Sequence, residues 1–466
     1  MKEKIDYKLF EKEEWTKEEY QEIEKYLKQD LIMTQKLWLY LIKKFDVLKE
    51  YISKEDAEKF KHITMSSGAY GYKVICHLLG LKEEYNEIEG NDEYQGAWVM
   101  QPKEESIKGE ILYFDFASLY PMMYIHANLF SPNCKCCKQE EKWHGNETFK
   151  VEGYYCQKQQ GKIEELIKDF YLKRKLYKLN KDGREFAIKI LLNSLYGISA
   201  KPSFKNVYNK YTASDCTFLA RQCIAFAIKE FEDKTYDVIY ADTDSCIIKL
   251  KSYQKEELCK KVAEEISIKI SNSFPFPFNE FCLKVDEELK YIQFFKGNNG
   301  ELNKKHYIYV NKKDKLKVVG LDIIKKDCTE LSRKIFDEYL KEQIIKNLDC
   351  KFKKDYIDKL IYKIINENKS IIAKRFNIKS LSSYKVKTSI YYLIGKLYGT
   401  GEILLIKNYK IGAGKGIKYC SLKEAEKLNI EDLDLNDIYK ELSPFIKDYK
   451  KNKQNKVKKI NQYKLF

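Results

Sequence analysis

The sequence predicts a mixed α+β protein with more than one domain. Apolar residues follow helical spacing through residues 18–45 and 162–196, and apolar β-rich runs flank tight turns within residues 237–250 and 304–324. Strands joined by a tight turn pair antiparallel, so antiparallel sheets are expected. The length of 466 residues exceeds one ordinary hydrophobic core and favours about two to four domains.

The first elements are expected to be helices, followed by a strand. The first 60 residues alternate charges with apolar residues at helical spacing, which predicts one or two amphipathic helices. The run EILYFDF (110–116) predicts an apolar strand with Asp115 near its end. Pro121 opens a helical stretch, because proline suits the first turn of a helix. Residues 133–160 are polar and contain cysteines, which predicts an irregular segment.

The second half is expected to alternate helices and strand pairs. The glycine-bearing connection NKDG (180–183) divides residues 162–196 into two antiparallel helices. A helix is expected at residues 214–232, before a hairpin within residues 237–250. A second pair of strands, KKHYIYVN and KLKVVGLDII, surrounds the turn KKDK, and the basic residues 327–400 are expected to be helical.

The charge of the chain favours a polyanionic partner. Lys and Arg number 86 against 70 Asp and Glu, which gives a formal charge of +16, and 37 tyrosines are interleaved with the basic residues. Basic and aromatic residues together suit a nucleic-acid channel. A lysine-rich composition inherited from an AT-biased genome would produce the same numbers, so the charge supports this interpretation without deciding it.

Targeting features favour a cytoplasmic protein. No apolar stretch reaches the roughly 18 residues that a membrane helix needs, and residues 1–15 lack the apolar region of a secretion signal. Most of the 13 cysteines are scattered singly, which fits a reducing compartment better than a disulfide framework. We therefore expect a cytoplasmic location and no membrane partner.

Three acidic residues are candidates for a metal site. Asp115 stands near the end of its strand, and Asp242 and Asp244 stand at the tip of a hairpin. Neighbouring carboxylates repel unless a cation lies between them. Two carboxylates and a backbone carbonyl suit Mg²⁺, which also accepts phosphate oxygens, and two such ions can stabilise both oxygens of a phosphoryl transfer. For the hairpin tip alone, an acidic surface turn is the alternative.

Five stretches occur in a recognisable order: YQGAW (94–98), DFASLYP (115–121), KILLNSLYG (189–197), YADTDS (240–245) and KKHY (304–307). The second, third and fourth strongly resemble the three polymerase motifs of the family B DNA polymerases. KKHY resembles a thumb-side KKxY motif, and YQGAW resembles the motif between the exonuclease and polymerase parts. The resemblance implies a right-hand polymerase architecture with an antiparallel-sheet palm, two-helix fingers and a mostly helical thumb.

The resemblance also implies a division into segments. They are a helical remnant of the exonuclease region (1–60), a linker with the YxGA motif (61–108), the first part of the palm (109–133), a cysteine-containing insertion with the fingers (134–198), the second part of the palm (199–326), the thumb (327–445) and a flexible tail (446–466).

The matched motifs imply a catalytic centre. Asp115 and Asp244 would bind two Mg²⁺ ions with the backbone carbonyl of Phe116, and Asp242 would be a secondary carboxylate nearby. Tyr120 would lie under the incoming sugar and leave no room for a 2′-hydroxyl. This steric exclusion would make the enzyme prefer deoxynucleotides and disfavours an RNA-synthesising, primase-like enzyme.

The motif KILLNSLYG is expected to present one face of a helix. Lys189, Asn193, Tyr196 and Gly197 lie at spacings i, i+4, i+7 and i+8, which share a face. The resemblance implies that Lys189 contacts the triphosphate, while Asn193 and Tyr196 face the nascent base pair.

The preceding helix is expected to supply further phosphate ligands. Arg174 is the chosen residue because a guanidinium binds phosphate through two hydrogen bonds, with Lys173 and Lys178 as alternatives. The implied nucleotide-binding set is Ser118, Leu119, Tyr120, Arg174, Lys189, Asn193 and Tyr196. The implied DNA-binding set, whose contacts should be sequence-independent and salt-sensitive, is Tyr94, Gly96, Gly197, Tyr240, Thr243, Lys304, Lys305 and Tyr307.

Only one exonuclease motif of the family is matched. YLKQD (26–30) fits its YxxxD pattern through Tyr26 and Asp30, and the two earlier motifs would lie upstream of Met1. One carboxylate cannot hold two metal ions, so 3′–5′ exonuclease activity is not expected from this chain alone. The segment is interpreted as the docking region of a separately encoded exonuclease subunit or as a decayed remnant, and a chance match on an amphipathic helix is the alternative.

The chain ends in a short motif that predicts a protein partner. QYKLF (462–466) fits the QxxLF pattern that docks replication proteins into a bacterial-type sliding clamp. Gln462 would form hydrogen bonds, and Leu465 and Phe466 would fill an apolar pocket. A disordered tail without this role is the alternative.

A cysteine cluster predicts a zinc site. Cys134 and Cys137 have the CxxC spacing, and Cys156 follows. With either His144 or Cys136 as the fourth ligand, they would form a tetrahedral Zn²⁺ site. Free thiols are the alternative.

The predicted function is that of a DNA-directed DNA polymerase in DNA replication. It would add dNTPs to a primer 3′ end on a template by two-metal phosphoryl transfer. The alternative is a non-catalytic relative that grips primer–template DNA as a scaffold.

Overall fold

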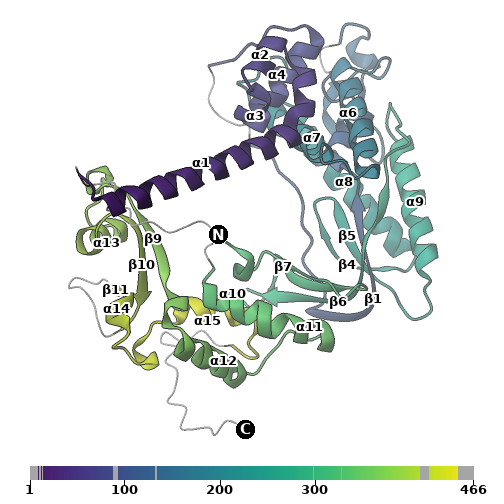
Figure 1. Ribbon diagram of the computed structural model, residues 1–466. Coiled ribbons are helices and arrows are strands. Elements are labelled where there is room, and N and C mark those ends of the chain that lie inside the picture. Colours follow the sequence, from purple (N-terminus) through teal and green to yellow (C-terminus); the bar gives the residue numbers. More distant parts are fainter. Residues whose placement is uncertain are drawn as a thin grey trace. The chain divides into compact units, whose positions relative to one another are not determined.

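The computed structural model describes Leu9, Lys12 and residues 14–87, 93–131, 134–297, 299–326, 328–409 and 419–449 (Figure 1). Helices and antiparallel sheets both occur, so the predicted mixed α+β class is confirmed. The chain divides into two compact units. Unit 1 comprises Met1–Gln29, Glu105–Lys108 and Lys290–Phe466, and unit 2 comprises Asp30–Glu104 and Gly109–Leu289.

Three elements contribute residues to both units. They are the helix α1 (Lys17–Phe45) and the strands β1 (Ser106–Phe116) and β6 (Leu283–Lys296). The helices that lie wholly in unit 2 are α2 (Lys54–Glu58), α3 (Lys61–Thr64), α4 (Ser67–Leu79), α5 (Leu119–Ala127), α6 (Lys162–Leu179), α7 (Glu185–Ser199), α8 (Thr212–Asp233) and α9 (Glu256–Asn272). Its remaining strands are β2 (Trp143–Gly145), β3 (Lys150–Tyr155), β4 (Asp237–Asp242) and β5 (Ser245–Lys249).

The main sheet of unit 2 has the strand order β4-β5-β1-β6. The predicted hairpin is confirmed, because β4 and β5 pair antiparallel across the turn at Thr243 and Asp244. Phe114 and Phe116 of β1 are fully buried, while Asp115 between them is only partly buried, as the alternation of a strand requires. The apolar face therefore anchors the strand and leaves Asp115 on the opposite face.

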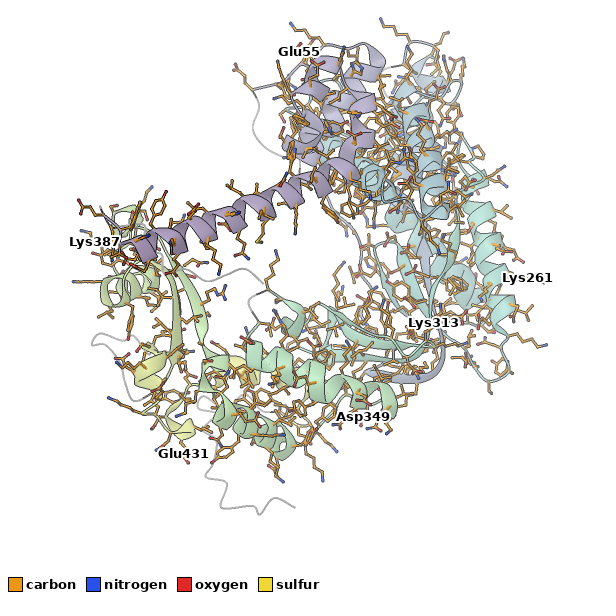
Figure 2. All side chains as sticks on the ribbon, viewed as in Figure 1. Glu55, Lys261, Lys313, Asp349, Lys387 and Glu431 are labelled. Carbon is orange, nitrogen blue, oxygen red and sulfur yellow. The ribbon has the colours of Figure 1, made fainter. Side chains whose placement is uncertain are left out.

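Helices α8 and α9 lie beside this sheet (Figure 1). The ring of Phe231 on α8 packs on Phe114 of β1, with centroids 5.3 Å apart. The labelled Lys261 marks the exposed side of α9, and the labelled Glu55 marks α2 (Figure 2). The expected helix at residues 214–232 corresponds to α8 and is confirmed.

Part of residues 133–160 is a hairpin, so the expectation of an irregular segment is wrong there. Strands β2 and β3 pair antiparallel, and Asp215 of α8 accepts hydrogen bonds from the backbone N–H groups of Glu152 and Gly153 and from the Tyr155 hydroxyl, at 2.7–2.9 Å. These partners are about 60 residues away in the sequence. The hairpin thus depends on tertiary contacts that local composition does not reveal.

The predicted pair of antiparallel helices is confirmed as α6 and α7, which are joined across residues 180–184. Residues 67–79, expected to belong to a linker, instead form α4, which packs against α7. A Cβ atom at Gly71 would lie 2.6 Å from the Ser194 hydroxyl. The missing side chain of Gly71 therefore lets α4 approach α7 closely.

Unit 1 contains a strand pair, a helical region and a small sheet. The predicted second strand pair is confirmed as β7 (Leu302–Asn311) and β8 (Leu316–Val319), with the labelled Lys313 in the turn between them (Figure 2). The small sheet has the order β11-β10-β9. The other elements are α10 (Glu330–Ile335), a π-helical turn (Phe336–Leu340), α11 (Lys341–Asn347), α12 (Lys354–Glu367), β9 (Lys374–Ile378), α13 (Ile390–Tyr398), β10 (Gly401–Lys407), β11 (Tyr419–Ser421), α14 (Leu422–Ala425) and α15 (Asn436–Leu442).

Two expectations for unit 1 are corrected. The strand expected to run to Ile324 ends at Val319, because the next residue, Gly320, has a left-handed φ of +71°. A Cβ atom at Gly320 would collide with the backbone carbonyl of Lys305, so no other residue fits there. Residues 327–400 are not all helical, since β9 pairs with β10 and buries Phe376 and Ile378. Among the described residues, no helix is both long and apolar enough to cross a membrane.

Candidate active site

The backbone brings Asp115 next to the hairpin tip. In the antiparallel register Asp115 faces Ser245 of β5, and Ser245 faces Asp242 of β4. The Phe116 N–H donates a hydrogen bond of 2.8 Å to the Asp244 carbonyl. Asp115 and Asp244, 129 positions apart, thus meet where two neighbouring strands end, as predicted from the two stretches.

Asp115, Asp244 and Asp286 form an acidic cluster. Burial, together with the neighbouring carboxylates of Asp244 and Asp286, raises the pKa of Asp115 to about 7. Lys284 and Lys178 act in the opposite direction and lower this pKa. A cation among these carboxylates would relieve their repulsion. Oxygen ligands of this kind fit Mg²⁺, so the donor set agrees with the predicted metal site.

The YQGAW stretch lies along the hairpin. The Thr243 N–H donates to the Trp98 carbonyl at 3.0 Å, and the Met100 N–H donates to the Ala241 carbonyl at 2.8 Å. Arg221 of α8 donates hydrogen bonds to the carbonyls of Gln95 and Gly96. These hydrogen bonds hold the YQGAW stretch beside the acidic cluster and bring Gly96 close to Thr243.

Three tyrosines from three of the predicted motifs meet at the site. The hydroxyls of Tyr94 and Tyr196 are 3.0 Å apart, and the rings of Tyr120 and Tyr196 have centroids 5.1 Å apart. Burial raises the pKa of both Tyr94 and Tyr120, so these hydroxyls stay neutral at physiological pH. The predicted stretches therefore converge on one region of unit 2.

The predicted face of α7 is the solvent-facing one. Lys189, Asn193 and Gly197 are exposed and Tyr196 is half-buried, whereas the leucines between them, Leu191, Leu192 and Leu195, are buried in the core. An exposed lysine and amide can reach a ligand without disturbing packing. The helical spacing read from the sequence thus describes the accessible side of α7.

The structure gives the three candidate phosphate ligands on α6 different surroundings. The Arg174 guanidinium donates to the Glu185 carboxylate at 2.7 Å and to the Ser118 hydroxyl at 2.8 Å, so it connects α6, α7 and the turn before α5. Lys173 pairs with Asp169 at 2.8 Å. The exposed Lys178, one helical turn beyond Arg174, lies within electrostatic reach of Asp115.

Several predicted site residues have buried side chains. Leu119 and Tyr240 are each 1% exposed and belong to the core, and the Phe116 ring stacks on Phe281. Only the backbone of these residues can face a ligand. In unit 1, Lys304 and Lys305 are exposed on β7, while Tyr307 is buried against Phe294.

The structure distinguishes the two predicted alternatives for the fourth member of the cysteine cluster. The sulfurs of Cys134, Cys136, Cys137 and Cys156 all lie within 4.8 Å of one another. His144 is outside this group: its Nδ1 lies 2.7 Å from the Gly153 carbonyl, and its ring stacks on Tyr154. Of the two predicted alternatives, Cys136 is the one that joins the set.

The remaining predicted residues belong to the exonuclease motif and to the clamp-binding motif. Tyr26 and Asp30 lie one turn apart on α1, with Tyr26 buried and Asp30 half-buried. The clamp-binding residues Gln462, Leu465 and Phe466 lie outside the described residues.

Three charged residues of the site were missed from the sequence. Lys284 and Asp286 alternate along β6 on the same side, a period-two signal that could have drawn attention to an acidic residue beside β1. Arg221 is the one charged residue between Asp215 and Lys229 of α8, and an isolated charge in an apolar stretch is a signal for a polar role. Neither signal identifies Asp115 as the neighbour.

Comparison with known proteins identifies the family. Residues 9–392 match the family model described as DNA polymerase family B. This match covers most of the chain, so the chain belongs to DNA polymerase family B, and the family predicted from the motifs is confirmed.

Relatives in several organisms agree. The DNA polymerase of Thermococcus gorgonarius is 28% identical over 390 residues, which cover 77% of this chain and 47% of the relative. DNA polymerase 1 of Sulfolobus acidocaldarius is 26% identical over 443 residues, covering 84% of this chain and 47% of the relative. The DNA polymerase delta catalytic subunit of Plasmodium falciparum is 27% identical over 326 residues, covering 62% of this chain and 29% of the relative.

The fold is similar to a solved structure of the same family. The family B DNA polymerase from Pyrobaculum calidifontis matches with a TM-score of 0.58 at 17% identity, over 94% of this chain and 57% of that chain. This similarity concerns the fold alone. The chain spans about half the length of the curated relatives it matches.

Proposed function

We propose that this chain is a DNA-directed DNA polymerase that adds deoxynucleotides to a primer 3′ end on a DNA template. The acidic cluster carries the proposal: Asp115 and Asp244 meet at the ends of paired strands, and burial together with the nearby carboxylates raises the pKa of Asp115 to about 7. Membership in DNA polymerase family B supports it. In this proposal the main sheet of unit 2 forms the palm, α6 and α7 form the fingers, and residues 327–445 form the thumb.

Asp115 and Asp244 would hold two Mg²⁺ ions together with the Phe116 carbonyl, with Asp242 and Asp286 as nearby carboxylates. Bound there, the ions would offset the negative charge that develops on the attacking and leaving oxygens during phosphoryl transfer. The chain's own contribution is positional. Asp115 lies next to the end of β1 and Asp244 lies in the turn of the β4–β5 hairpin, and the hydrogen bond between Phe116 and Asp244 joins the two, so the ligand geometry needs little rearrangement before the reaction.

Residues of α6 and α7 would bind the incoming nucleotide. Lys178 and Lys189 are exposed cations that would contact the triphosphate. Arg174 is a positioning residue, because its hydrogen bonds to Glu185 and Ser118 hold the two helices against the turn that precedes Tyr120. The ring of Tyr120 would exclude a 2′-hydroxyl from the sugar site.

Primer extension tests the proposal. The wild-type chain with Mg²⁺, a labelled primer–template and dNTPs is expected to extend the primer. D244N should lose more than about 100-fold in rate, because loss of a direct metal ligand should exceed the 10–100-fold effect of a residue that only supports one. D237N is the matched control, since Asp237 lies at the far end of the same hairpin and pairs with Lys103 at 3.8 Å.

The outcomes separate the two candidate functions. Extension by D244N at the wild-type rate would contradict the metal assignment. No extension by the wild type, combined with tight primer–template binding, would favour the non-catalytic scaffold. Normal extension by D237N would show that the loss in D244N does not come from a general defect of the hairpin.

A role in DNA replication is part of this proposal, as are its protein partners. A sliding clamp would bind the terminal motif, and a separate exonuclease subunit would bind the region of Tyr26 and Asp30. Binding of full-length chain and a chain lacking residues 462–466 to a bacterial-type clamp would test the first partner, with equal affinity as the outcome against it.

A further inference from the structure

We propose that Cys134, Cys136, Cys137 and Cys156 bind one zinc ion, and that this ion fastens the segment after α5 to the start of α6. The site is separate from the acidic cluster and would be structural. Its ligands are four thiolates, a set that holds zinc in many proteins without participating in chemistry.

The sulfur positions fit one metal ion. The Cys134 and Cys137 sulfurs are 3.0 Å apart, those of Cys136 and Cys156 are 3.1 Å apart, and those of Cys137 and Cys156 are 3.8 Å apart. Four thiolates at the zinc–sulfur distance of about 2.3 Å in a tetrahedron have sulfurs about 3.8 Å apart. A disulfide would require about 2.05 Å, and a cluster of several iron atoms would separate the sulfurs further.

The backbone holds the cysteines where a metal site needs them. The Cys156 N–H donates to the Ser131 hydroxyl at 3.0 Å, and the Cys156 carbonyl accepts from the Asn128 amide at 2.8 Å. The Cys134 N–H donates to the Ser131 carbonyl at 3.2 Å. Both parts of the ligand set are thus fixed to the turn that ends α5.

The same turn continues into α6. The Asn128 side-chain oxygen accepts the N–H of Gly161, the residue that precedes the first turn of α6, at 2.8 Å. Asn128 also donates to the Gln159 carbonyl at 3.0 Å. An ion at the cysteines would therefore stabilise the junction from which α6, and with it Arg174 and Lys178, projects.

Residues 134–142 contribute no side chain to the hydrophobic core. None of these nine positions is fully buried in the structure, so the hydrophobic core does not secure the segment. Metal binding can supply folding free energy that apolar burial lacks. Lys135, Lys138 and Lys158 accompany the cysteines and suit the net charge of −2 that four thiolates and one Zn²⁺ would carry.

Metal analysis of the full-length chain is the first test. Protein purified without added chelator is expected to contain one zinc ion per chain, measured by inductively coupled plasma mass spectrometry. Replacement by Co²⁺ should give the intense sulfur-to-cobalt charge-transfer bands and the visible bands of a tetrahedral four-thiolate site. Iron in place of zinc, or a chain lighter by four hydrogens in intact mass because two disulfides have formed, would overturn the proposal.

Variants test the ligand set. C136S is expected to bind zinc at least tenfold more weakly, since loss of a direct ligand should exceed the effect of losing a supporting residue. H144A should retain one zinc ion with the wild-type cobalt spectrum. C328S is the matched control, because Cys328 is a half-buried cysteine of unit 1. Zinc loss in H144A with retention in C136S would overturn the four-cysteine set.

A measurement on the unmodified chain guards against misfolding of the variants. Removal of zinc by a chelator should make residues 134–160 the new site of limited proteolysis, and added zinc should restore protection. Equal cleavage with and without zinc would contradict the structural role.

Discussion

Glu164 is a buried acid whose ionisation should affect stability. It is fully buried on α6, and its Oε1 accepts the Phe130 N–H at 2.6 Å, while its Oε2 has no hydrogen-bond partner among the described residues. Burial is the main cause that raises the pKa of Glu164 to about 7. The folded chain therefore retains this proton at pH values where the unfolded chain has released it.

The pH dependence of stability follows from that shift. Because the folded pKa is the higher one, the stabilisation is fully present below about pH 4 and is lost as the pH rises through about 7. E164Q should remove at most about 3 kcal/mol of this decline in the free energy of unfolding. At pH 8 the variant should therefore unfold at a higher urea concentration than the wild type. Urea unfolding of both proteins at pH 5 and pH 8 measures the difference. E257Q, at an exposed position of α9, is the control and should keep the wild-type slope.

Tyr120 is predicted to set the choice of sugar. Its ring is half-buried against Tyr196, so its position is fixed beside the acidic cluster. Y120A should raise the relative efficiency of ribonucleotide incorporation by about 10–200-fold, the range expected when a pocket gains or loses a small group. The measurement is kcat/KM for single ATP and dATP additions. Y120F keeps the ring and should keep the discrimination, and equal discrimination in Y120A would contradict the assignment.

The residues of the site differed in how well the sequence predicted them. Asp115 and Asp244 could be predicted because each lies in a stretch that resembles a family B polymerase motif, whereas the acidic turn alone would also fit a surface hairpin. Asp286 could not, because its contribution depends on β6 lying beside β1, a pairing that only the folded sheet defines. Arg174 was predicted as a phosphate ligand, and its hydrogen bonds to Glu185 and Ser118 are contacts that the local sequence does not reveal.

At the scale of elements, local patterns predicted the strands and helices with their own periodicity. The hairpin β4–β5 and the helix pair α6–α7 show their alternation or spacing within a few residues. The hairpin β2–β3 was missed because its stability comes from Asp215. Its inward residues Val151, Gly153 and Tyr155 do alternate, but six residues of mixed polarity do not distinguish a strand from a loop.

Helix α4 supports α7 through a close approach that can be tested. G71A should lower the stability by about 1–3 kcal/mol, because the new methyl group would meet the Ser194 hydroxyl at 2.6 Å. G68A is the matched control on the same helix, since its methyl group would contact Ile198 at an ordinary 3.5 Å. Alanine also favours the helix, so G68A should be neutral or stabilising by up to about 1 kcal/mol.

A double variant identifies the cause. S194A removes the hydroxyl that the Gly71 substitution would meet, so G71A combined with S194A should recover most of the lost stability. Urea unfolding of the four proteins measures the coupling. Additive effects of the two substitutions would show that the hydroxyl is not the obstacle.

At the scale of the whole molecule, the net charge of +16 favours DNA without specifying where it binds. Many lysines pair with acids on the surface, and these pairs contribute little to a long-range field. The division into two units also separates the candidate residues, because the acidic cluster is in unit 2 and the exposed Lys304 and Lys305 are in unit 1.

The salt dependence of DNA binding tests the role of unit 1. Each phosphate contact adds about 0.9 to the slope of log affinity against log salt concentration. Replacing Lys304 and Lys305 together by alanine should therefore weaken primer–template binding and reduce that slope by up to about 2, equally for different sequences. K261A is the control, since Lys261 is an exposed lysine of α9 outside the predicted DNA-binding set (Figure 2). Fluorescence anisotropy titrations between 50 and about 300 mM salt measure the slopes. An unchanged slope in the double variant, or an equal change in K261A, would contradict a phosphate-binding role for β7.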